Sequence, residues 1–221
     1  DEIENEVIVW FEKVINDEKK ILSTGFSTYY EHLNQLIEWV KIQQMVSEPM
    51  NENEFWNIIN RSKEDSSDQF NSMVNILKKL PFKKIVSFLI KIEELLYDSY
   101  NEKLWCAAYL VNKGCSDDEF EFFRLWLISQ GKETFYSVLN TPDSLIDFIP
   151  ENNDSKLEFE NLLFAADAAA TDYCVPSFFI NYEKCTKIGT NYPDLCFSWN
   201  DKHPESLKQI CPRLFMQYYS L

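Results

Sequence analysis

Glycine is scarce in this sequence, with 4 residues in 221. A protein built from many short strands needs tight turns, and glycine is common at those turns, so its scarcity favours helices over an all-β fold. Basic residues are also few: 21 Lys and Arg stand against 36 Asp and Glu, which gives a formal net charge of −15. This charge disfavours binding to nucleic acid or to an anionic membrane, and it favours a basic protein partner.

Several familiar signals are missing. No run of 18 apolar residues is present, which excludes a transmembrane helix, and the acidic beginning DEIENEVIVWF is unlike a signal peptide. The sequence has no glycine-rich phosphate loop, HExxH, GxSxG or EF-hand pattern, so we expect no cofactor and no dedicated metal site. Six cysteines occur without a CxxC pair, which is typical of free thiols in a reducing cytoplasm: Cys106, Cys115, Cys174, Cys185, Cys196 and Cys211.

What the sequence does contain is apolar side chains at helical spacing. Hydrophobic residues make up 45% of the chain, enough for a core. We therefore predict an all-α fold, a multi-helix bundle with an N-terminal helical hairpin and an irregular C-terminal segment. Residues 1–49 would form the hairpin and a linker, and residues 50–221 a helical domain.

The predicted hairpin covers residues 1–44, and its two helices meet at Ser23-Thr24-Gly25. Two helices alone cannot bury their apolar seam well. The hairpin must therefore pack on its own chain, on a second copy to form a homo-oligomer through residues 1–44, or on another protein.

Further helices are predicted along the rest of the chain. One begins at Asn51, one follows a cap at Ser66 or Ser67, and a long one begins at Phe82 and could continue past Asn101. A helix over residues 156–174 is expected after a cap at Asp154 or Ser155. Residues 175–199 are irregular, and Pro212 should bend or divide the last helix.

The stretch Asn101 to Gly131 organises these predictions. Gly114 follows an apolar run, where a helix end favours a residue with positive φ. Ser116 and Glu119 match the capping-box pattern for the start of a second helix. That helix carries apolar groups on several sides, so we expect it to be central, with Trp126 in the core.

The same stretch contains three motifs: Leu104-Trp105-x-Ala107-Ala108-Tyr109, Gly114-Cys115-Ser116-Asp117-Asp118-x-Phe120, and Phe123-Arg124-x-Trp126-Leu127-Ile128-x-Gln130-Gly131. These motifs carry a resemblance to a bacterial family, domain of unknown function 4240. It extends to Phe55-Trp56 and to Pro212-Arg213-Leu214, roughly residues 50–221. The resemblance implies a compact, mostly helical bacterial domain, with no established activity and no catalytic residues to transfer.

Five residues are candidates for a binding site. Asp117 and Asp118 could serve a metal or acid–base site, although their position fits helix capping better. Arg124 lies among aromatic residues, so it either extends to solvent or is buried and paired with a carboxylate, and a structural ion pair is favoured over anion binding. Asp167 and Asp172 interrupt an alanine-rich helix, either on its outer side or as buried functional groups.

The C-terminal cysteines leave three alternatives open. Cys174, Cys185, Cys196 and Cys211 with His203 could form a zinc site, two of them could form a disulfide, or all could be buried free thiols. Cys196 or Cys211 could also act as a nucleophile beside His203, although no nucleophile motif surrounds them.

Three functions follow from these features. The first is a non-enzymatic, acidic protein–protein interaction domain, such as an inhibitor or immunity protein for a basic bacterial effector. The second is a carboxylate- or metal-dependent enzyme of unknown substrate. The third is a scaffold or regulatory protein that assembles through its N-terminal hairpin.

Overall fold

The computed structural model describes residues 49–64, 68–149, 155–170 and 192–219. Within these ranges every regular element is a helix and no strand is formed, so the predicted all-α fold is confirmed. The elements, in chain order, are α3 (Glu52–Glu64), α4 (Gln69–Leu77), α5 (Phe82–Asp98), α6 (Glu102–Asn112), α7 (Asp117–Ser129), α8 (Lys132–Asn140), the 3-10 helices η1 (Pro142–Asp147) and η2 (Glu160–Phe164), α9 (Ala165–Ala170), α11 (Pro204–Ile210) and α12 (Pro212–Tyr218). The hairpin predicted over residues 1–44 lies outside the described residues.

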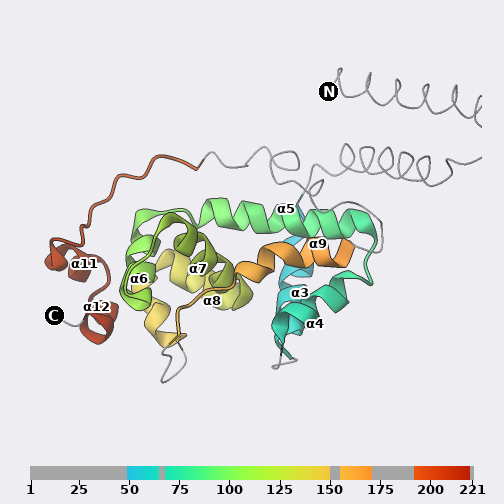
Figure 1. Ribbon diagram of the computed structural model, residues 1–221, viewed down its shortest axis with the longest axis horizontal. Coiled ribbons are helices and arrows are strands. Elements are labelled where there is room, and N and C mark those ends of the chain that lie inside the picture. The colour runs from blue at the N-terminus through green and yellow to red at the C-terminus, as the bar shows by residue number, and fades with distance from the viewer. Residues whose placement is uncertain (1–48, 65–67, 150–154, 171–191, 220–221) are drawn as a thin grey trace, which may run out of the picture.

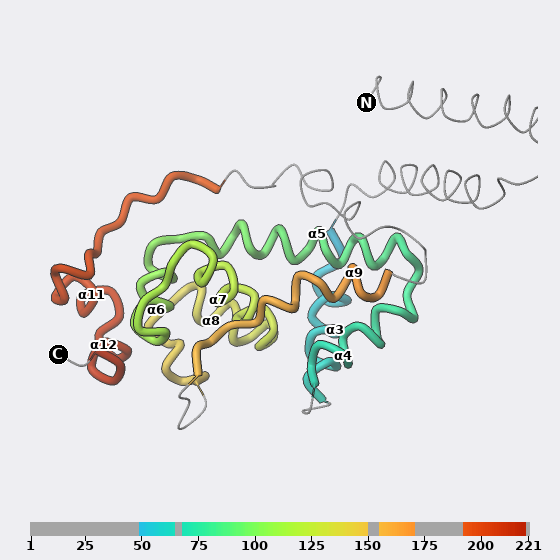
Figure 2. Tube along the Cα trace, viewed as in Figure 1, coloured from blue at the N-terminus to red at the C-terminus, as the bar shows by residue number. Residues whose placement is uncertain are grey.

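Helix α5 is the element against which both halves of the described structure pack. It is 17 residues long, and α3, α4 and α9 lie along one half of it while α6, α7 and α8 lie along the other (Figure 1). Its buried side chains, including Ile85, Phe88, Leu89 and Ile92, are spread around the helix because neighbours contact it on several sides. Helices α11 and α12 lie at the far end, next to α6 (Figure 2).

Helix α7 is central, as the sequence predicted. Phe120, Phe123 and Leu127 on this helix have no exposed surface. The Phe120 ring stacks on Trp105 of α6, with 4.5 Å between ring centroids. Trp126 differs from the prediction: it is partly buried and packs against the edge of the core beside Phe123.

The turn between α6 and α7 has the positive φ and the capping box that its residues predicted. Lys113 takes the left-handed conformation with φ of 58°, and Gly114 follows with φ of 122°. The Ser116 hydroxyl accepts a hydrogen bond from the Glu119 backbone N–H, and the Glu119 carboxylate accepts one from the Ser116 N–H at 2.8 Å. Both arms of the capping box are therefore present, and the direction of α7 is fixed at its first turn.

Two predicted helix boundaries were wrong. Asp68, rather than Ser66 or Ser67, caps α4, because its side chain accepts from the Asn71 backbone N–H. Helix α5 ends at Asp98 and does not continue past Asn101. The Asn101 side chain instead caps α6 by accepting from the Leu104 N–H at 2.9 Å.

The helix predicted over residues 156–174 was also wrong at its start. Residues 156–159 are not helical, and η2 and α9 follow them. The reason is tertiary pairing: the Leu157 N–H donates to the Asn112 side chain at 2.9 Å, and the Phe159 N–H donates to the Phe122 carbonyl at 3.1 Å. These contacts with α6 and α7 replace the hydrogen bonds of a first helical turn.

The C-terminal part behaves as predicted where it is described. Residues 192–199 are irregular, and Pro212 divides the last helix into α11 and α12. The irregular segment is held on α6 because the Trp199 indole donates to the Glu102 carbonyl at 2.7 Å.

Replacing Ser116 with alanine should lower the free energy of unfolding by about 1 kcal/mol, since the N-cap acceptor is lost. Urea denaturation measures the difference. Ser116→Asp is the matched control, because aspartate keeps an acceptor at the cap and should retain most of the stability. Equal stability of Ser116→Ala and the parent chain would contradict the capping role.

Candidate functional site

The predicted site residues that the structure describes do not form one cluster. Asp117 and Asp118 are exposed in the first turn of α7, where anions stabilise the helix dipole. Asp167 is partly buried on α9, and burial raises the pKa of its carboxyl group. Asp172 lies outside the described residues. Among the residues that the structure describes, no group of three or more His, Cys, Asp or Glu residues could hold a metal ion.

Arg124 differs from these aspartates because its side chain is buried among backbone carbonyl groups and aromatic rings. Only 1% of its surface is exposed. Its guanidinium donates to the Leu96 carbonyl through Nη1 and to the Phe120 carbonyl through Nε, the latter at 3.3 Å. Leu96 belongs to the last turn of α5, whose carbonyls carry the negative end of the helix dipole. Arg124 thus connects α7 to the C-terminal end of α5.

Three aromatic rings complete the surroundings of this cation. The Arg124 guanidinium carbon lies 5.1 Å from the centroid of Tyr100 and 4.8 Å from those of Phe120 and Tyr192. Tyr100 and Tyr192 stack on each other at 4.2 Å. Such cation–π contacts compensate part of the hydration that the guanidinium loses on burial.

The predicted ion pair of Arg124 with a carboxylate was wrong for the described residues. None of their carboxylates lies within 4.0 Å of the guanidinium nitrogens, and the cation is stabilised by carbonyl groups and rings instead. Of the two alternatives for Arg124, extension to solvent is wrong, because the side chain is buried.

Two carboxyl groups nevertheless interact with this cation electrostatically. Glu93 on α5 and Glu121 on α7 are both partly buried. Burial, reinforced by the negative charge of Glu121, raises the pKa of Glu93 to about 7, while Arg124 acts in the opposite direction. Burial also raises the pKa of Glu121, again opposed by Arg124. We define Glu93, Glu121, Arg124, Tyr100 and Tyr192 as the candidate site.

Glu93 and Glu121 were not among the site residues predicted from the sequence. Glu121 and Arg124 are three residues apart on one helix, so the sequence placed them on neighbouring positions of α7. Glu93 and Tyr192 gave no such signal, because only the packing of α5 and the C-terminal segment on α7 brings them to Arg124.

The structure describes four of the six cysteines, and their state bears on the zinc, disulfide and free-thiol alternatives. Cys106, Cys115, Cys196 and Cys211 are free thiols. Hydrogen bonding to Cys106 and burial raise the pKa of the Cys211 thiol, which keeps it protonated and a poor nucleophile. Cys174 and Cys185, on which the zinc alternative also depended, lie outside the described residues.

The described structure defines an all-α domain organised around a long helix and a buried arginine. Residues 50–171, more than half of the chain, match the family described as protein of unknown function, DUF4240, and the chain belongs to this family. The resemblance seen in the sequence is confirmed there, whereas Pro212-Arg213-Leu214 lies beyond the matched residues. No curated protein and no solved structure matches the chain. None of the described helices is long and apolar enough to cross a membrane.

The raised pKa of Glu93 predicts a pH-dependent stability. Between about pH 4.5 and 7 the folded chain keeps a proton that the unfolded chain has lost, so the free energy of unfolding falls as pH rises through this window. Glu93→Gln should remove this loss. At pH 8 the variant should be about 1 to 3 kcal/mol more stable than the parent chain, and below pH 4 the difference should vanish.

Urea denaturation at both pH values measures this effect. Glu133→Gln is the control. Glu133 is an exposed carboxylate in the first turn of α8, and its replacement by glutamine removes the same charge as Glu93→Gln. The prediction is contradicted if the stability difference between Glu93→Gln and the parent chain is the same at pH 8 and at pH 4. That result would show that ionisation of Glu93 does not lower the free energy of unfolding.

Proposed function

We propose that this chain is a non-enzymatic, acidic interaction domain that binds a basic protein, as an inhibitor or immunity protein of a basic bacterial effector would. The observation that carries this proposal is the formal net charge of −15 in 221 residues. A field of this sign attracts a positively charged partner over a distance of about 10 Å at moderate salt and speeds its association. It opposes nucleic acid and anionic membranes as partners.

Within this acidic chain, the candidate site brings two carboxyl groups, Glu93 and Glu121, close enough to repel each other. The Arg124 guanidinium already donates to the Leu96 and Phe120 carbonyls. Its positive charge therefore only partly offsets the repulsion between Glu93 and Glu121. A lysine or arginine of a partner placed beside these two carboxyl groups would relieve the repulsion. It would also lower the pKa of Glu93 and release a proton near pH 7.

A bacterial cytoplasm is the setting that we propose for this function. Free thiols support a reducing compartment, because Cys106, Cys115, Cys196 and Cys211 are unpaired. A small acidic inhibitor that protects its own cell from a basic effector would act there.

Binding of a basic partner should depend on salt and on the two glutamates together. The full chain is immobilised and exposed to a lysate of its own organism at low and at high salt. The expected result is capture of a basic protein at low salt, with weaker capture at high salt. Calorimetry in buffers of different ionisation enthalpy should then show proton release at pH 7.

A charge-matched pair of variants separates the site from net charge. Glu93→Gln/Glu121→Gln should weaken binding roughly tenfold or more, since close charge pairs contribute about 1.5 kcal/mol or more at such interfaces. Glu64→Gln/Glu133→Gln removes the same charge from two exposed positions and should bind nearly as well as the parent. Capture of only neutral or acidic proteins, or no capture at any salt, would overturn the proposal.

One observation favours a second function, an enzyme that uses carboxyl groups. A glutamate with a pKa of about 7 beside another carboxyl group resembles the acid–base pairs that transfer protons near neutral pH. A catalytic activity that Glu93→Gln abolishes and Glu133→Gln keeps would move the assignment to this second function.

A further inference from the structure

Two cysteine thiols meet in the interior at the junction of α11 and α12. Cys106 is in the middle of α6 and Cys211 separates the two C-terminal helices, and neither has exposed surface. The Cys106 side chain is close enough to Cys211 to raise the pKa of the Cys211 thiol. The Cys106 thiol also lies 3.9 Å from the Leu207 carbonyl, which accepts the Cys211 backbone N–H at 2.9 Å. The Cys106 sulfur and the Cys211 backbone N–H therefore contact the same carbonyl group, which places the two residues next to each other.

This thiol pair lies where the C-terminal helices join the rest of the domain. Helices α11 and α12 contain seven residues each and pack on α6 and η1 at one end of the structure (Figure 1). The Leu207 and Leu214 side chains of these helices are fully buried, whereas their polar attachments are exposed: the Arg213 N–H donates to Asp143 at 3.0 Å, and the Arg213 guanidinium pairs with Asp147. Helices this short are not stable alone, so their position depends on these contacts.

We propose that Cys106 and Cys211 form a reversible disulfide that covalently joins the C-terminal helix pair to α6 when the cell becomes oxidising. The oxidant is a low-molecular-weight disulfide such as oxidised glutathione. One cysteine thiolate attacks this disulfide, forms a mixed disulfide and releases one thiol. The second thiolate then attacks the cysteine sulfur of the mixed disulfide and releases the other thiol. Each cysteine loses its proton to solvent or to a released thiolate, and the oxidant is reduced to two thiols.

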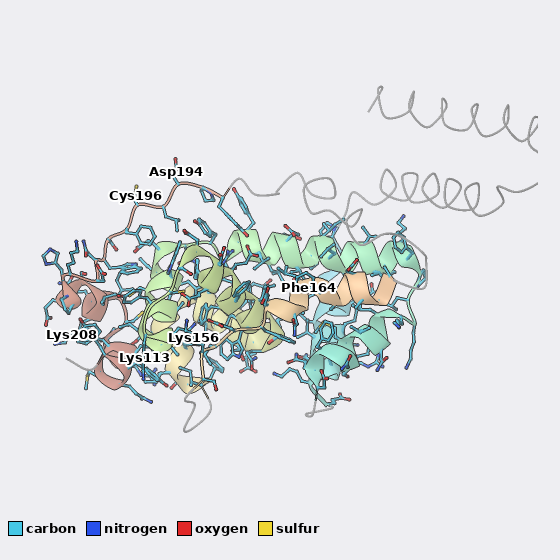
Figure 3. All side chains as sticks on the ribbon, viewed as in Figure 1. Lys113, Lys156, Phe164, Asp194, Cys196 and Lys208 are labelled. Carbon is cyan, nitrogen blue, oxygen red and sulfur yellow. The ribbon has the colours of Figure 1, made fainter. Side chains whose placement is uncertain are left out.

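Access to the pair requires local opening of α11 and α12. Both sulfur atoms are inaccessible in the closed structure, and the Cys211 thiol is held protonated by Cys106 and by burial. Terminal elements with few contacts open far more often than the whole fold unfolds. Oxidation of the pair should therefore be slow compared with Cys196, which is exposed on the irregular segment before α11 (Figure 3).

The disulfide should stabilise the closed arrangement. It would close a long loop of chain between residues 106 and 211, which restricts the unfolded ensemble. It would also prevent α11 and α12 from separating from α6. The melting temperature should rise by several degrees, and amide hydrogen exchange in α11 and α12 should slow.

The experiment treats the full chain with oxidised glutathione and maps its disulfides by mass spectrometry of proteolytic peptides. The expected product contains a peptide pair joined through Cys106 and Cys211, melts at a higher temperature, and returns to the starting state with dithiothreitol. In Cys115→Ser/Cys196→Ser both effects should persist. Cys106→Ala and Cys211→Ala should each lose the rise in melting temperature, and circular dichroism checks that they fold.

Other products would overturn the proposal. These are mixed disulfides with glutathione alone at full conversion, or a crosslink that joins Cys106 or Cys211 to Cys174 or Cys185. A Cys106–Cys211 crosslink that lowers the melting temperature would also contradict the stabilising role. Because peptide mapping is done on the parent chain, the result does not depend on whether the alanine variants fold.

Discussion

A guanidinium group buried between two helices is the interaction on which the described structure depends most. Arg124 extends from α7 and donates to the carbonyl of Leu96, at the end of α5, where backbone acceptors no longer have helical partners. Neighbouring groups satisfy the adjacent carbonyls, since Ser99 donates to Leu95 through both its N–H and its hydroxyl. A planar guanidinium with several donors suits this position better than the ammonium of lysine, because it bonds to carbonyls while stacking on rings.

The same cation links the family domain to the segment that follows it. Tyr192 lies beyond the matched residues 50–171, yet its ring packs over Arg124 and on Tyr100. Trp199 adds a second attachment, to the backbone of α6. These aromatic contacts hold the C-terminal segment beside α7. The proposed disulfide between Cys106 and Cys211 would add a covalent link at the end of the same segment.

The charge of Arg124 also explains why two glutamates are tolerated near the core. Glu93 and Glu121 lose hydration on burial and repel each other, and Arg124 offsets part of both effects. The remaining imbalance favours a cation from outside. The proposed binding of a basic partner at these two partly buried carboxyl groups is therefore compatible with a buried structural cation in the same region.

The local features of this fold could be predicted from the sequence because their causes are local. Ser116 and Glu119 form a capping box, and Pro212 divides the last helix, because each effect involves neighbours in the chain. The residues around Arg124 could not be predicted in this way, since Leu96 and Tyr192 reach it only through packing. The non-helical backbone of residues 156–159 has a similar origin, because Asn112 and Phe122 accept its N–H groups.

The central claim, that Arg124 holds α5 and α7 together, is tested most directly by the free energy of unfolding of Arg124→Met. Methionine keeps much of the volume but cannot donate, so it leaves the Leu96 and Phe120 carbonyls without this donor. The predicted loss is on the order of 3 kcal/mol, since two hydrogen bonds from a charged donor are removed. An unchanged free energy of unfolding would contradict the account.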